Sequence, residues 1–154
     1  MSINPKVYRL SISRVERWTQ LNQYEGLVKG DINGRSICLH FVASSEAEWS
    51  ELLPNTNVDV EVWLARVEEL PLCQSEVIPP TLQELTGEAD IAHYTAQGKI
   101  VDFDKYGSIY LETGFLSPLM VDMEIPSHLK ESWNPEIGKF IQMLGSLRMD
   151  IPDQ

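Results

Sequence analysis

Cysteine is scarce in this chain, which has only Cys38 and Cys73 among its 154 residues. Two cysteines 35 positions apart do not form the close pairs that ligate structural zinc. Sparse cysteine is typical of proteins from a reducing compartment, where disulfides are rare. We therefore expect a cytoplasmic protein in which Cys38 is a small buried residue. A single disulfide between the two cysteines is the alternative.

Long apolar runs are missing too. No stretch approaches the roughly 20 apolar residues that span a bilayer, and residues 1–6 contain no apolar core of a secretory signal. We therefore expect neither a membrane span nor a secretion signal. An apolar content of 43% over 154 residues is enough for one domain with a sizeable core, or for two small units that share one.

Basic residues are scarce beyond position 35. Residues 1–35 carry six Lys and Arg against three acids, a local charge of +3, whereas residues 36–154 carry six against twenty acids, a local charge of −14. Nucleic-acid affinity depends largely on Lys and Arg that neutralise phosphates, so direct binding of DNA or RNA is disfavoured. A basic protein partner fits this charge, although solubility alone also accounts for it.

Recognisable catalytic patterns are missing as well. The nine glycines stand singly, so no phosphate-binding loop occurs, and no serine lies in a nucleophile elbow. Glu88, Asp90 and His93 are close in sequence, but their spacing does not place three metal ligands on one side of a helix. The sequence therefore supports neither an enzyme nor a resident metal or cofactor.

An internal echo is the most informative feature that is present. Five residues recur 72 positions later: Gly26, Val28, Ser36, Ile37 and Leu39 correspond to Gly98, Ile100, Ser108, Ile109 and Leu111. A second match, at an offset of 84, relates Trp49 to Trp133. Self-similarity at a long period predicts two copies of one supersecondary unit.

The expected elements follow a similar order in both halves. Asn33-Gly34 between apolar runs predicts a hairpin over 24–42, and period-two alternation predicts a strand over 58–64. Between them, acids after a serine predict a short helix over 44–53. The other expected elements are a strand passing into a turn or short helix at 7–21, a helical turn at 81–86, strands at 99–103, 108–112 and 119–123, a short helix or turn at 127–133, and a strand bent at Gly145 over 137–149.

The order of hairpin, helix-like insert and long bent strand resembles an OB-like or related small Greek-key barrel, in which Gly-bent strands let a sheet close. The resemblance covers about residues 24–70 and 96–151. It implies a mainly β protein with short helices. We expect a first β unit at 1–75, a proline-containing connector with a short helix at 76–95, and a second β unit at 96–154, packed as one compact domain.

The first candidate contact surface is acidic and lies on the predicted helix. Glu46, Glu48 and Glu51 would spread over its exposed face, where carboxylates can steer a basic partner. Trp49 is either the core anchor of that helix or a contact with the partner.

The second candidate is the pair Asp102 and Asp104, beside the turn of the second predicted hairpin. The two flank Phe103, so strand alternation puts both carboxylates on one face. Such a pair could contact a partner or hold a divalent cation, and edge charge and turn capping explain it without either role.

These features together predict an acidic protein-binding module, most concretely a bacterial immunity or inhibitor protein that blocks the basic cleft of a toxin nuclease. One alternative is an OB-type module that binds single-stranded nucleic acid or a sugar on aromatic side chains. Another is an accessory subunit of a larger assembly. The sequence does not determine the oligomeric state or the partner.

Overall fold

The computed structural model describes residues 6–18, 24–66, 73–85, 92–123, 125, 127–129 and 131–152. Strands and two short helices make up the secondary structure of these ranges. In chain order they are β1 (Val7–Arg17), β2 (Glu25–Ile32), β3 (Arg35–Val42), α1 (Glu46–Ser50), β4 (Asn57–Arg66), β5 (Thr81–Glu84), β6 (His93–Phe103), β7 (Ile109–Glu112), β8 (Leu119–Asp122), the 3-10 helix η1 (Ser127–Leu129) and β9 (Phe140–Asp150).

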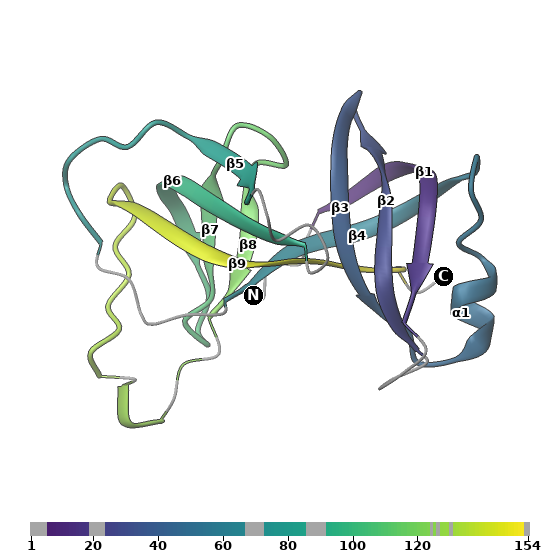
Figure 1. Cartoon of the computed structure of the whole chain (residues 1–154). Coiled ribbons are helices and arrows are strands. Elements are labelled where there is room, and N and C mark those ends of the chain that lie inside the picture. Colours follow the sequence, from purple (N-terminus) through teal and green to yellow (C-terminus); the bar gives the residue numbers. More distant parts are fainter. Residues whose placement is uncertain are drawn as a thin grey trace.

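Eight of the strands close into a ring, in the order β1-β2-β3-β9-β6-β7-β8-β4. Strands β4 and β9 also pair with each other, and this pairing divides the ring into two five-stranded barrels. The first barrel is β1-β2-β3-β9-β4 and the second is β6-β7-β8-β4-β9. Figure 1 shows the two barrels as separate groups of strands that β4 and β9 connect.

Each barrel has the strand order of an OB-type barrel. Three antiparallel strands form a meander, and the third then pairs in parallel with a strand from the other half of the chain: β3 with β9, and β8 with β4. The remaining strand closes the barrel by pairing with the first, β4 with β1 and β9 with β6. The prediction of small OB-like barrels in a mainly β chain is confirmed.

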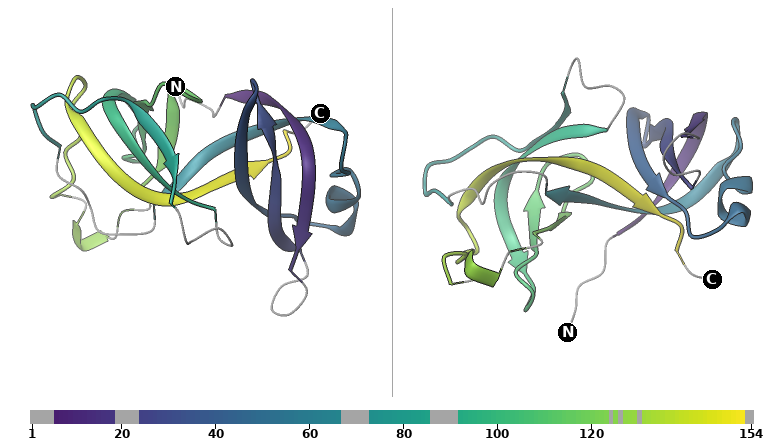
Figure 2. Two further views of the ribbon diagram at one scale, coloured as in Figure 1. Left: turned by 45° about the horizontal axis from the view of Figure 1, so that its top comes forward. Right: turned by 60° about the horizontal axis from the view of Figure 1, so that its bottom comes forward.

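Each half of the chain can contribute a strand to the other half's barrel because β4 and β9 are long enough to pair in both barrels. The first half of β4, 57–61, pairs with β1, and 63–65 pairs with β8. The first part of β9, 140–146, pairs with β6, and 148–149 pairs with β3. Both strands run from one barrel into the other (Figure 2). Neither the unit of residues 1–75 nor that of 96–154 closes a barrel alone.

Two tryptophans show how the halves correspond. Trp49 donates its indole N–H to the Tyr24 carbonyl at 2.7 Å, and Trp133 donates to the Gly107 carbonyl at 2.8 Å. Each carbonyl lies just before the second strand of its meander, β2 or β7. The offset of 84 therefore relates equivalent residues. The offset of 72 does not relate equivalent residues. It matches β2 and β3, the second and third strands of the first meander, with β6 and β7, the first and second strands of the second meander.

The strand expected at the start of 7–21 is confirmed as β1, which continues to Arg17; the turn or short helix expected after it falls largely on residues 19–23, which lie outside the described ranges. The register of β1 against β2 shifts between Ile12 and Arg14, and this bulge changes the apolar period from two to three without ending the strand. The prediction of a helical turn at 81–86 is wrong, because Thr81–Glu84 form strand β5, which pairs with β6.

Both barrels are filled by one cluster of apolar side chains, and their outer sides touch in places. Cys38 is buried and both cysteines are free thiols, so the disulfide alternative is wrong. The Cys38 N–H donates to the Tyr94 hydroxyl at 2.9 Å, which joins β3 of the first barrel to β6 of the second. The Arg35 guanidinium lies 4.2 Å from the Phe115 ring centroid and forms a second bridge.

In the described part of the chain, no helix is long and apolar enough to cross a bilayer.

Candidate functional site

Eight residues, one from each strand of the ring, lie side by side across both barrels. Cross-strand pairing joins them in the order Asp102, Tyr110, Met120, Trp63, Arg148, His40, Leu27, Glu16. Directly paired residues project from the same side of a sheet. The alternate residues of β4 and β9 fill the barrels, so this row, which we call the outer band, follows the outer side of the sheet; two of its members, Leu27 and Tyr110, are nevertheless buried, at 0% and 3% exposure.

The centre of the outer band is an aromatic ring with a cation beside it. Trp63 of β4 is paired with Arg148 of β9, and the guanidinium carbon lies 5.9 Å from the indole centroid. Both residues are half-buried, as are their neighbours Met120 and His40. A partly exposed cation–π pair contributes roughly 0.5–1 kcal/mol, so it orients the two side chains without fixing them strongly.

Carboxylates flank this centre along the strands. The outward residues of β4 before Trp63 are Asp59 and Glu61, and Glu61 is paired with Asp150 of β9. On the other side of Trp63, Asp122 of β8 is paired with Ala65 of β4. Successive outward residues of a strand are about 7 Å apart, so Asp59 and Glu61 lead up to Trp63 and Asp122 lies one step beyond it. We call Asp59, Glu61, Asp150 and Asp122 the acidic stripe.

An open groove of about 410 Å³ lies where the stripe begins. Glu51, just after α1, and Asp59 both line it, together with Ile151 and Pro152 near the end of the chain. Arg9 also lines the groove and pairs with Asp59 at 3.0 Å, with both side chains more than half exposed. A surface pair of this kind is worth little, so a cationic side chain of another molecule can compete for Asp59.

His40 is a titratable residue of the outer band whose pKa is shifted by its surroundings. Its ring stacks on Trp18 with centroids 5.4 Å apart, and its side chain is 17% exposed. Nε2 lies 3.4 Å from a Glu25 carboxylate oxygen and makes no hydrogen bond within the described residues. Burial lowers the pKa of His40; Glu25 opposes this effect and Arg148 adds to it. His40 is therefore neutral at neutral pH.

This shift predicts a pH dependence of stability. An unfolded histidine titrates near pH 6.5, so below that pH the unfolded chain binds a proton more readily than the folded one. The free energy of unfolding should fall as the pH drops below about 6.5, by at most about 1.4 kcal/mol per pH unit from this group. His40→Phe keeps a ring against Trp18 and should flatten that part of the curve in urea titrations between pH 8 and 5. Parallel curves for the two proteins would contradict the assignment.

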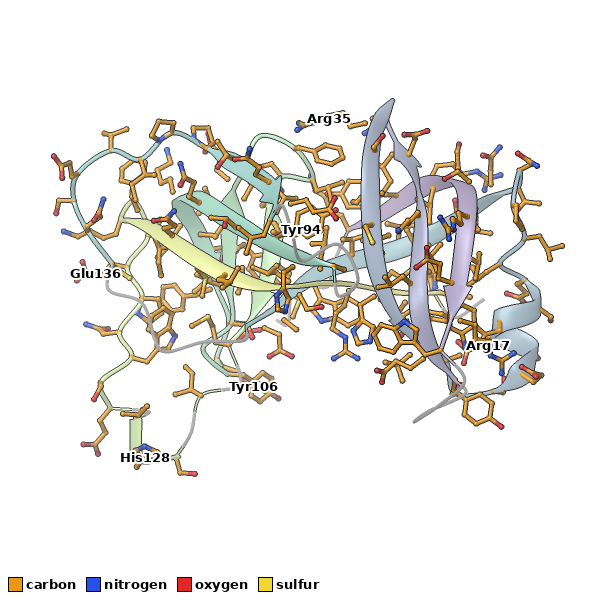
Figure 3. The ribbon with its side chains drawn as sticks, viewed as in Figure 1. Arg17, Arg35, Tyr94, Tyr106, His128 and Glu136 are labelled. Atoms are coloured by element: carbon orange, nitrogen blue, oxygen red, sulfur yellow. The ribbon has the colours of Figure 1, made fainter. Side chains whose placement is uncertain are left out.

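The predicted residues of 44–53 do not form one free acidic face. Glu46 pairs with Arg17, which lies beside α1 in Figure 3, and Glu48 accepts the Ser44 N–H at 2.7 Å. Glu51 reaches the groove. Trp49 is 5% exposed and packs edge-on against Phe41 with centroids 5.1 Å apart. The interpretation of Trp49 as a partner contact is therefore corrected: it is the core anchor of the helix.

Asp102 and Asp104 lie together, far from α1. Asp104 accepts the N–H groups of Tyr106 and Ser108 at 2.9 and 3.0 Å, and so holds the β6–β7 turn. Asp102 accepts the N–H of Phe103 at 2.8 Å and ends the outer band. Burial first, and then these two carboxylates, raise the pKa of Tyr110. The two acids belong to the second barrel and α1 to the first (Figure 1), so the fold does not join the two predicted clusters.

Within the described ranges, no three His, Cys, Asp or Glu side chains gather in a way that could hold a metal ion. Of the residues considered for a metal, Glu88 and Asp90 lie outside those ranges, and His93 is half-buried on β6.

Sequence reasoning missed the charged residues around Trp63, namely Arg148, Glu61, Asp150 and Asp122. One signal was available: the alternation over 58–64 puts Trp63 on the polar side of its strand with Asp59 and Glu61. The pairing of β4 with β9, which brings Arg148 and Asp150 beside them, has no local signature.

No protein-family model matches this chain, and neither the curated proteins nor the solved structures contain a match to it. The candidate function therefore depends on the chemistry of the outer face alone.

Proposed function

We propose that this protein is an acidic protein-binding module whose acidic stripe and Trp63 engage a basic protein. Its most concrete form is a bacterial, cytoplasmic immunity or inhibitor protein that covers the basic nucleic-acid-binding cleft of a toxin nuclease. The observation that carries the proposal is a half-buried tryptophan in the middle of a sheet face, with Glu61 of β4 on one side of it and Asp122 of β8 on the other.

The proposed mechanism is competitive exclusion of substrate. Carboxylates on one face attract a cationic cleft over several ångströms and raise the association rate. Trp63 then supplies the buried aromatic contact that typically dominates a protein interface, and the carboxylates around it set orientation. The rigid sheet beneath holds these side chains in place before binding, which reduces the entropy lost on association.

The alternative of an OB-type module for single strands or sugars keeps one observation in its favour. Trp63 lies half-buried on a strand shared by two OB-type barrels, where aromatic side chains can stack on bases. Single-strand binding also needs a cationic groove. Here Arg148 stands among carboxylates, so the basic protein partner is favoured.

The decisive experiment compares two double variants with the same change in net charge. The partner is first captured from a native extract at low salt, and binding kinetics are then measured. Glu61→Lys with Asp150→Lys should slow association at least tenfold. The matched control, Glu76→Lys with Glu131→Lys, changes exposed acids away from the stripe and should leave the rate within about threefold. Trp63→Ala should mainly speed dissociation.

Salt gives a second measurement. Association with the captured protein should slow strongly between about 50 and 500 mM salt. Equal effects of the two double variants, or a rate indifferent to salt, would contradict the proposal. Binding of single-stranded oligonucleotides or oligosaccharides that Trp63→Ala abolishes would support the alternative instead.

A further inference from the structure

Strand β5 leaves one edge of its backbone without a neighbouring strand. Among the described strands it ends the sheet and pairs only with β6. Leu85 N–H donates to the His93 carbonyl at 3.0 Å, and bonded and non-bonded pairs alternate along an antiparallel ladder. Leu82 and Glu84 therefore direct their N–H and C=O groups away from β6, and these backbone groups make no hydrogen bond within the described residues.

Strand β3 leaves a second such edge. The two-residue turn at Asn33-Gly34 makes Ile32 and Arg35 the closing bonded pair of the hairpin, so Ser36 directs its backbone groups away from β2. Strand β9 covers the far side of β3 only at 40–41. The Cys38 N–H is occupied by the Tyr94 hydroxyl, whereas the Ser36 backbone groups have no partner in the described ranges.

The two edges face each other across the space between the barrels. One hollow of about 390 Å³ is lined by Arg35 at the start of β3 and by Thr81–Gln83 of β5. A second, of about 300 Å³, extends over Ser13 of β1 and 29–31 of β2 to 36–38 of β3, and Glu84 at the end of β5 borders it. The two strands thus border the same slot and run along it in the same direction. Figure 3 labels Arg35 at the upper end of β3 and Tyr94 between the barrels.

We propose that this slot receives an extended segment of another polypeptide, which adds a strand between β3 and β5. Exposed strand edges present rows of donors and acceptors that an extended chain completes. The added segment would exchange main-chain hydrogen bonds with Ser36 on one side and with Leu82 and Glu84 on the other. The Tyr94–Cys38 hydrogen bond closes the inner end of the slot, and the length of β5 limits the segment to about four residues.

The side chains around the slot define the chemical class of this ligand. The lining carries both signs of charge: Lys29 and Arg35 are basic, and Asp31 and Glu84 are acidic. Leu82 is buried beneath, and the apolar lining consists of Pro80 and the Phe115 ring, on which the Arg35 guanidinium lies. Recognition would therefore depend mainly on the peptide backbone. The slot shares no residue with the acidic stripe, so this inference does not depend on the proposed function.

Proline substitutions test the edges directly. Glu84 and Ser36 are exposed and their N–H groups point into the slot, so Glu84→Pro and Ser36→Pro remove a slot donor while the ladders to β6 and β2 keep their bonds. Glu84→Ala and Ser36→Ala are matched controls that keep the N–H. The probe is a displayed library of random linear peptides selected against the wild-type protein. Selected peptides should lose about tenfold in affinity with each proline and less than about twofold with each alanine.

Amide hydrogen exchange on the wild-type protein provides a measurement that needs no variant. A bound peptide should slow exchange at the Ser36 and Glu84 amides. If no selected peptide distinguishes the wild-type protein from the proline variants, or if peptides slow exchange only at other amides, the slot is not a strand-addition site. Unfolding in urea shows whether each proline variant is folded. If a variant is not folded, the hydrogen exchange of the wild-type protein decides whether the slot binds the peptide.

Discussion

Leu64→Ala should lower the free energy of unfolding by about 3 to 4 kcal/mol, and the whole protein should still unfold in one transition. Leu64 of β4 is 0% exposed and is paired with Leu147 of β9, also 0% exposed, where the two barrels meet. A cavity at this point removes contacts from strands that belong to both barrels. Neither barrel can therefore keep its full stability while the other loses it.

The measurement is a urea titration followed by tryptophan fluorescence and by circular dichroism. Leu53→Ala is the matched control, because Leu53 is 55% exposed and its truncation should cost less than about 0.5 kcal/mol. Two separated transitions, with only one displaced by Leu64→Ala, would show that the barrels are independent. That result would contradict the role assigned to the shared strands.

Gly145→Val should be about as damaging, with a loss of about 3 kcal/mol or a failure to fold. A Cβ at Gly145 would lie 2.4 Å from the Ala65 carbonyl oxygen and 2.8 Å from Leu64 Cγ. The carbonyl is backbone and cannot rotate away, so β9 would have to separate from β4. The separation would occur where β9 passes from the second barrel into the first.

Gly138→Ala separates this steric effect from backbone conformation. At Gly138 an added Cβ meets nothing within 4 Å, but φ is +93°, which an alanine adopts at a cost of about 1 kcal/mol. Thermal unfolding of both variants should therefore show the larger loss for Gly145→Val. A smaller loss of stability for Gly145→Val than for Gly138→Ala would mean that β4 and β9 pair less closely than in this structure.

Local chemistry was sufficient to predict much of the first barrel. Asn33-Gly34 defined a hairpin, and alternation over 58–64 defined β4, because turn geometry and strand amphipathicity are properties of adjacent residues. The offset of 84 correctly related Trp49 and Trp133. The excess of acids was also legible from the sequence.

Only the tertiary structure decided how the two halves combine. Strand β5 has a sequence that reads as a helical turn, and it is extended because β6 offers it a ladder of hydrogen bonds. Trp49 lies in the core and Trp63 on the surface, because the side of a strand or helix that is covered depends on its neighbours.

The sequence by itself determined the strand-rich composition, the turns and the charge, since each arises from residues close together in the chain. It could not determine that β4 and β9 each complete the other half's barrel, which places Arg148 beside Trp63 and Asp150 beside Glu61. Pairing between segments about 80 to 90 residues apart is chosen by the total burial and hydrogen bonding of the closed sheet, and no local periodicity records that choice.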